Sequence, residues 1–193
     1  MTTTLLDNLQ TVAKHLGQLG NDWALIGGLA VSAYVEPRFT RDIDIVVSVD
    51  DDAEAEDFVR TWREQGFRIC SVVEQEATER LATIRSRRSS DNQAIVDLMF
   101  ASSGLEPEIA AEAEVLELAP GVEVPVARLG HLIALKVLSH DDESRPQDGI
   151  DLGKLVEIAD EDELNAAREA LRTIEARGYA RGRNLQQLLQ DYT

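Results

Sequence analysis

The chain has 193 residues, of which 44% are hydrophobic and 28% charged, as is typical of one globular domain or of a domain with a helical appendage. A formal net charge of −17 argues against a broad basic surface that wraps DNA or RNA. No apolar run approaches the roughly 18–20 residues that span a bilayer, no signal peptide is visible, and the single Cys70 excludes an internal disulfide. We therefore expect a cytoplasmic protein that binds neither DNA nor membranes.

The first half of the chain alternates helical and strand patterns. Leu5 to Leu19 carries leucine and valine at helical spacing, and Gly20 ends it with turn chemistry. Acidic residues 50–52 cap a helix that runs to about 65. The other expected elements are a helix over 29–34 and strands over 23–26, 42–49, 66–73, 81–87, 94–100, 115–118 and 122–126. Residues 89–92 are the expected turn between the strands 81–87 and 94–100.

From Arg128 onward the strand patterns end and only helical spacing remains. The expected helices are 129–139, 149–159, 161–177 and 181–191. The sequence therefore predicts an α/β domain over residues 1–127, followed by a helical C-terminal part over 128–193 that packs on it.

Gly27 and Gly28 separate an expected strand from an expected helix. Glycine lets backbone amides approach a ligand closely, and a helix N-terminus presents free N–H groups to phosphate. The pair therefore suggests a phosphate-binding turn, although a Gly-Gly pair by itself is more often a plain turn.

Three aspartates stand at strand positions that favour a shared site. Asp42 and Asp44 begin one strand, and because residues two apart project from the same side, their carboxylates face the same way. Their mutual repulsion calls for a cation, and Mg²⁺ prefers such carboxylates together with substrate phosphates. Asp97 interrupts an apolar strand, where a buried carboxylate needs a partner. The alternatives are a solvated strand end for the pair and a solvent-facing edge for Asp97.

Two arginine clusters lie within this acidic chain. The first contains Arg80, Arg85, Arg87 and Arg88, and the second lies among residues 168–183. Each is either a solvated face that offsets acidic neighbours or a contact surface for a polyanionic acceptor.

Gly27-Gly28, the run Arg38-Phe-Thr-Arg-Asp-Ile-Asp44 and the later strand aspartate Asp97 together resemble the nucleotidyltransferases of the DNA polymerase β superfamily. The second half narrows this resemblance. Lys136 within an apolar helix, followed by Arg145-Pro-Gln-Asp148-Gly-Ile-Asp151-Leu, is similar to the AbiEii toxin branch. The resemblance spans about residues 23–155 and implies a nucleotidyltransferase fold with a small mixed sheet flanked by helices.

The resemblance also implies roles for individual residues. The implied metal ligands are Asp42, Asp44 and Asp97, and the implied catalytic set adds Lys136 and Asp148. Gly27, Gly28, Arg41 and Lys136 would bind the nucleotide. Arg38 and Arg41 either pair with a site carboxylate or contact phosphate, and Asp151 is a weaker candidate than Asp148 for positioning the lysine. The alternative for Lys136 is a lysine whose stem packs on an amphipathic helix, and for Asp148 it is a helix cap.

The implied reaction moves a nucleoside monophosphate from an NTP such as ATP to an acceptor hydroxyl with Mg²⁺ or Mn²⁺. The family suggests an RNA acceptor, such as a tRNA 3′ end, and a toxin role opposed by an antitoxin protein, although the acidic chain weakens the RNA reading. A small-molecule acceptor such as an antibiotic and a protein acceptor are alternatives of the same class. A catalytically silent module that binds nucleotide or a partner, and a purely structural α/β protein, are alternatives of other classes.

Overall fold

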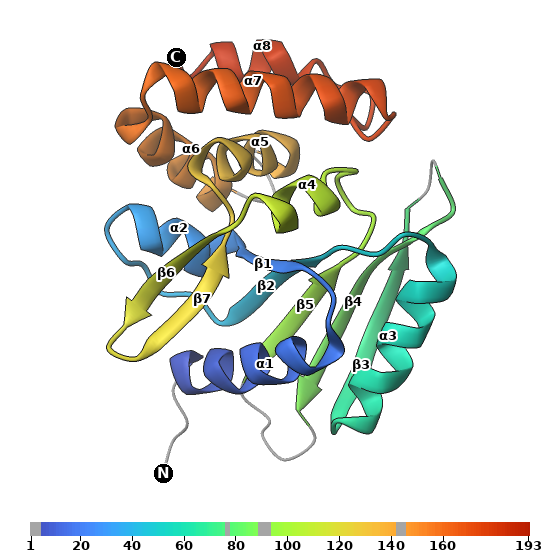
Figure 1. Ribbon diagram of the computed structural model, residues 1–193. Coiled ribbons are helices and arrows are strands. Elements are labelled where there is room, and N and C mark those ends of the chain that lie inside the picture. The colour runs from blue at the N-terminus through green and yellow to red at the C-terminus, as the bar shows by residue number, and fades with distance from the viewer. Residues whose placement is uncertain (1–4, 76–77, 89–93, 142–145) are drawn as a thin grey trace.

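The computed structural model describes residues 5–75, 78–88, 94–141 and 146–193, in which one seven-stranded mixed sheet forms the centre (Figure 1). In chain order the strands are β1 Trp23–Ile26, β2 Asp42–Val47, β3 Phe67–Glu74, β4 Leu81–Arg88, β5 Ile95–Met99, β6 Glu114–Ala119 and β7 Val122–Val126. Their order across the sheet is β3-β4-β5-β2-β1-β7-β6. The expected mixed sheet flanked by helices is confirmed.

Strand pairing places β2 and β5 at the middle of the sheet. β2 runs parallel to β5 and antiparallel to β1, and β4 runs antiparallel to β5. The apolar residues of β2, Ile43 and Ile45, are fully buried on the face opposite its two aspartates. Since side chains alternate along a strand, this burial fixes which face presents the carboxylates.

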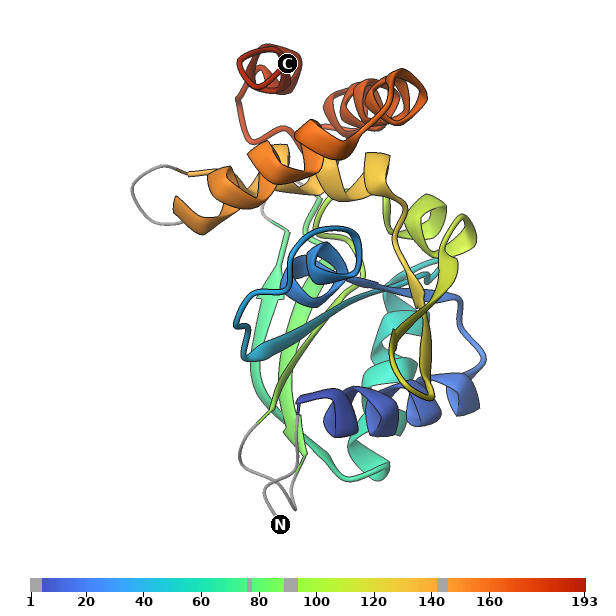
Figure 2. The ribbon, with the colours of Figure 1, turned by 90° about the vertical axis from the view of Figure 1, so that its left-hand side faces the viewer.

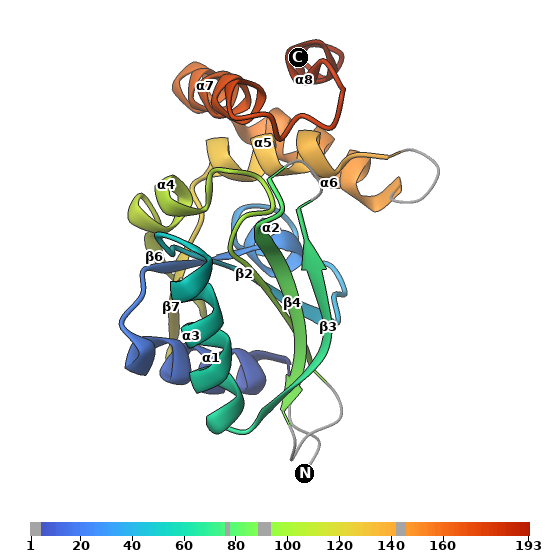
Figure 3. The ribbon, with the colours of Figure 1, turned by 90° about the vertical axis from the view of Figure 1, so that its right-hand side faces the viewer.

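Eight helices are present among the described residues. They are α1 Leu5–Leu19, α2 Gly27–Tyr34, α3 Asp52–Glu64, α4 Glu106–Ala111, α5 Leu129–Ser139, α6 Pro146–Ile158, α7 Glu161–Ala176 and α8 Leu185–Gln190. Helices α1 and α3 pack on one face of the sheet, and α5 to α8 gather at one end of the molecule (Figures 2 and 3). The side chain of Asp51 caps α3 by accepting a hydrogen bond from the amide of Glu54 at 2.9 Å. None of the described helices has both the length and the apolar character needed to cross a membrane.

Helix α5 joins the sheet to the outer helices. It is buried on almost every side, with Leu132, Ile133 and Val137 at or near zero exposure, because it packs against α2, α6, α7 and α8. One hydrophobic core runs from α1 and α3 through the sheet to α5 and α7. The last strand ends at Val126, one residue before the expected boundary, and the division into two domains stays a prediction.

Several expected boundaries were wrong. Helix α2 begins at Gly27 rather than at 29, and α6 begins at Pro146 rather than at 149, since proline suits the first helical position. Helix α4 was not expected, although Pro107 among acidic residues is a recognised helix start. The expected turn 89–92 lies outside the described residues.

Candidate active site

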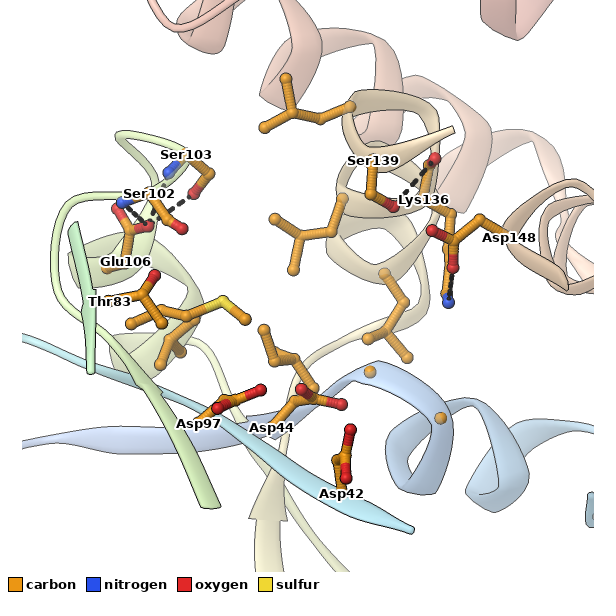
Figure 4. Close-up of a pocket in the computed structure, with 18 of the residues that line it drawn as sticks. Asp42, Asp44, Thr83, Asp97, Ser102, Ser103, Glu106, Lys136, Ser139 and Asp148 are labelled. Carbon is orange, nitrogen blue, oxygen red and sulfur yellow. Dashed lines mark hydrogen bonds and ion pairs between the residues drawn. The ribbon is translucent and has the colours of Figure 1, made fainter. Parts of the chain in front are cut away.

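Four charged side chains on one face of the sheet form the floor of a cavity of about 410 Å³. Arg85 on β4 stands opposite Asp97 on β5, Asp97 stands opposite Asp44 on β2, and Asp44 stands opposite Ile26 on β1. Asp42 lies two residues before Asp44 on the same face of β2. Figure 4 shows the three aspartates on neighbouring strands beneath the cavity. We call Asp42, Asp44, Asp97 and Arg85 the acidic floor.

The two glycines at the start of α2 give room to two different charged side chains. Gly27 has a φ of +65°, and a Cβ built on it would lie 2.6 Å from Cγ of Asp44. A Cβ on Gly28 would lie 2.9 Å from a guanidinium nitrogen of Arg38. Any larger residue at either position would displace a cavity side chain. The N-cap residue of α2 is Ile26, whose side chain cannot accept from the first-turn amides.

Arg85 binds Asp97 through two hydrogen bonds. Its Nε donates to Oδ1 at 2.8 Å and its Nη2 to Oδ2 at 2.6 Å, and the same Nη2 lies 3.9 Å from Oδ2 of Asp42. This paired geometry is the strong form of an arginine–carboxylate contact. The hydrogen bond to Asp97 raises the pKa of Arg85 above its usual range, although burial opposes the shift. Arg85 is therefore a permanent cation of the floor.

A second group of four charges lies at the side of the cavity, and three of the four are buried. Nζ of Lys136 on α5 lies 2.5 Å from Oδ1 of Asp148 and 2.9 Å from Oδ2 of Asp151, both on α6. Arg38 donates to both oxygens of Asp151, at 2.8 and 2.7 Å. We call Arg38, Lys136, Asp148 and Asp151 the buried network. It ties the loop before β2 to α5 and α6.

The pKa of Asp151 records how well this network is paired. Burial alone would raise the pKa of its carboxyl, but hydrogen bonds from Arg38, Gln147 and Lys136 bring it below the ordinary value. Asp151 is therefore ionised and holds two cations at once.

The remaining walls are partly polar and partly apolar. Oε1 of the buried Glu106 accepts from the amides of Ser102 and Ser103 at 2.8 and 2.7 Å and from Oγ of Ser103 at 3.0 Å. Arg181, whose φ is +56°, also lines the cavity. The apolar lining comes from Val46, Met99, Leu132, Leu135 and Leu138.

Most of the residues expected from the sequence meet in this cavity. Its lining includes Gly27, Gly28, Asp42, Asp44, Asp97, Lys136 and Asp148. Arg41 is not brought there, because it is exposed and its guanidinium lies 5.5 Å from the ring centroid of Phe39. Lys136 does not follow the alternative of a lysine packed on an amphipathic helix, since it is only 7% exposed and fully paired.

Sequence reasoning gave Arg85 no place in the site and ranked Asp151 too low. Arg85 belongs to the first arginine cluster of the sequence, and the antiparallel register of β4 and β5 places it opposite Asp97. Asp151 was ranked below Asp148, yet it is the more buried of the two and holds both Arg38 and Lys136. The register of β4 and β5 accounts for the contact of Arg85 with Asp97. The contacts of Asp151 with Arg38 and Lys136 depend instead on how α6 packs.

A divalent ion fits two of the three aspartates. Asp42 and Asp44 are hard oxygen donors on the same face of one strand, and Mg²⁺ commonly binds one or two carboxylates with substrate phosphates. Among the described residues, no group of three or more carboxylate, histidine or cysteine side chains has the arrangement of a metal site. Asp97 lies beside the pair but is held by Arg85.

Comparison with known families gives a match over nearly the whole chain. The family described as "Nucleotidyl transferase AbiEii toxin, Type IV TA system" matches residues 13–191. This confirms the resemblance found in the sequence. No curated protein matches the chain in sequence.

Solved structures with a similar fold are nucleotidyltransferases. An antigenic nucleotidyltransferase-like protein from Paracoccidioides brasiliensis has a TM-score of 0.55 and 20% identity over 96% of this chain and 92% of its own. The antibiotic-resistance factor ANT(2″)-Ia has a TM-score of 0.51 and 16% identity, with 100% and 92% of the two chains covered. The lincosamide antibiotic adenylyltransferase LnuA has a TM-score of 0.50 and 14% identity, with 82% of this chain and 100% of its own covered.

Proposed function

The chain belongs to the AbiEii nucleotidyltransferase toxin family, and from this premise we propose that it transfers a nucleoside monophosphate from an NTP to an acceptor hydroxyl with Mg²⁺ or Mn²⁺. One observation carries the proposal. Asp42, Asp44 and Asp97 meet on one face of the sheet, beside the glycine turn that opens α2, in a cavity of about 410 Å³.

Three parts of the cavity lining would bind the nucleotide. Asp42 and Asp44 would hold a divalent ion, which would neutralise phosphate charge and polarise the phosphate oxygens. The first-turn amides of α2 donate to phosphate oxygens, since a helix N-terminus favours anions. Lys136 supplies a compact positive charge from α5, held in place by Asp148 and Asp151.

The transfer step makes one bond and breaks another. The acceptor oxygen bonds to the α-phosphorus, the bond from that phosphorus to the β-phosphate oxygen breaks, and pyrophosphate leaves with the electron pair. The hydroxyl proton passes toward Asp97, whose carboxylate keeps lone pairs beyond those that Arg85 uses. Rate acceleration comes mainly from positioning and from preorganised charge.

The family favours an RNA acceptor, such as a tRNA 3′ end, and a toxin role opposed by an antitoxin protein in the cytoplasm. A small-molecule acceptor is the second candidate. The antibiotic-modifying neighbours support it, and so do the apolar residues Leu132, Leu135 and Leu138 that line the cavity.

The experiment that tests the proposal is incubation of the protein with each α-labelled NTP, Mg²⁺ and total RNA, and in parallel with a panel of antibiotics and proteins. Label in the tRNA band that disappears in Asp42→Ala supports the RNA version, and label on an antibiotic supports the second candidate. Asp50→Ala is the matched control, because it removes an exposed carboxylate just beyond the same strand and outside the cavity. No labelled product in any arm would contradict the proposal.

A further inference from the structure

Arg85 is built into the acidic floor by the sheet itself. Its position opposite Asp97 follows from the register of β4 and β5. The next residue, Ser86, is fully buried, accepts from Nε1 of Trp62 at 3.0 Å and donates to the carbonyl of Val96 at 3.2 Å. These contacts hold the backbone of β4 against β5, so the guanidinium is carried on a rigid support.

The charges of the floor are balanced for one divalent ion. Asp42, Asp44 and Asp97 bring three negative charges, and Arg85 neutralises one of them through its two hydrogen bonds to Asp97. The four side chains of the floor therefore carry a net charge of −2, which a single divalent cation offsets. A second cation at Asp97 would meet the guanidinium, whose Nη2 lies 2.6 Å from Oδ2 of Asp97 and 3.9 Å from Oδ2 of Asp42.

We propose that Arg85 takes the place of a second metal ion, so that the nucleotide-bound site holds one divalent ion, on Asp42 and Asp44. Asp97 is then a carboxylate whose counter-ion belongs to the protein. The inference rests on the proposed function, because it assumes that the cavity binds an NTP together with a divalent ion.

The test counts bound Mn²⁺ by equilibrium dialysis of the full chain with non-hydrolysable α,β-methylene analogues of ATP, GTP, CTP and UTP, each used separately. We expect one Mn²⁺ per bound analogue for the wild type and two for Arg85→Ala, because loss of the guanidinium frees Asp97. Arg85→Gln, which keeps most of the side-chain stem without its charge, should also bind two. Arg85 is 45% exposed, so both variants are expected to fold, and thermal unfolding checks this.

Arg87→Ala is the matched control. Arg87 lies two residues along the same face of β4 but does not line the cavity, so its removal takes away the same charge and should leave one ion bound. Two ions in the wild type, or one ion in both Arg85 variants, would overturn the inference and leave the proposed function standing. If no analogue binds with Mn²⁺, the proposed function falls and this inference falls with it.

Discussion

The acidic floor and the buried network each contain four charged side chains, but they hold them differently. On the floor, Asp42 and Arg85 keep 35% and 45% of their side-chain surface exposed, and Asp97, which Arg85 holds, keeps 9%. In the network, Lys136 and Asp151 keep 9% and 1%. A charge near water is screened and contributes little to stability, whereas a buried charge must be paired. Asp42 and Arg85 are therefore accessible to ligands, and the network fixes the geometry around them.

The largest effect is expected from removing a floor carboxylate. Asp44→Asn should lower the transfer rate by about 10³-fold or more, since a metal ligand stabilises several kcal/mol of transition-state charge and each 1.36 kcal/mol is tenfold. Thermal unfolding should stay within a few degrees of the wild type. A variant that keeps its activity, or that unfolds at a much lower temperature, would remove the contrast between floor and network.

Removing a carboxylate of the buried network should lower the free energy of unfolding. Asp151→Ala leaves the cations of Arg38 and Lys136 without their shared carboxylate, and breaking a buried ion pair in this way costs about 3–5 kcal/mol. Urea unfolding measures the change. Asp57→Ala is the control, because the Asp57–Arg60 pair is exposed on α3 and should change the free energy of unfolding by less than about 1 kcal/mol. Equal losses in the two variants would contradict the account.

Gly27 combines a positive φ with a close approach to Asp44 of the floor. Gly27→Ala adds a Cβ at positive φ and 2.6 Å from Cγ of Asp44, so we expect a loss of about 1–3 kcal/mol in stability together with a fall in activity. Gly20→Ala separates the two causes, since Gly20 also has a positive φ but nothing lies within 4 Å of its added Cβ. It should lose stability alone. Equal activity of the two variants would argue against the close approach of Asp44.

The smallest effect is expected from His131, a buried residue of α5 outside both the floor and the network. Its effect should appear only in the pH dependence of folding stability. The Nδ1 of His131 has no hydrogen-bond partner among the described residues, and burial lowers the pKa of the side chain below 6.5. Because the unfolded chain then takes up the proton first, folding stability should fall as the pH drops below about 6.5. The free energy of unfolding should decrease less between pH 7 and pH 5 in His131→Gln. Parallel pH profiles would show that His131 does not titrate in this way.

The sequence predicts the floor better than the network. Alternation along β2 predicts that Asp42 and Asp44 share one face, whereas the pairing of β2 with β5, which brings Asp97 and Arg85 beside them, joins strands that are distant in the chain. The network joins Arg38 to a residue 113 positions later, and that contact depends on the packing of α5 and α6, which no local pattern encodes. Arg41 was expected to bind the nucleotide, but although it precedes Asp42 in the chain, it is exposed and does not line the cavity.

The most direct test of the central claim is calorimetric binding of the four α,β-methylene NTP analogues with Mg²⁺ and with EDTA. The account predicts that the wild type binds at least one analogue at a 1:1 ratio with Mg²⁺, and that binding weakens strongly in EDTA and in Asp42→Asn and Asp44→Asn. Binding of equal strength with and without Mg²⁺, unchanged in both variants, would show that these carboxylates are not the nucleotide–metal site.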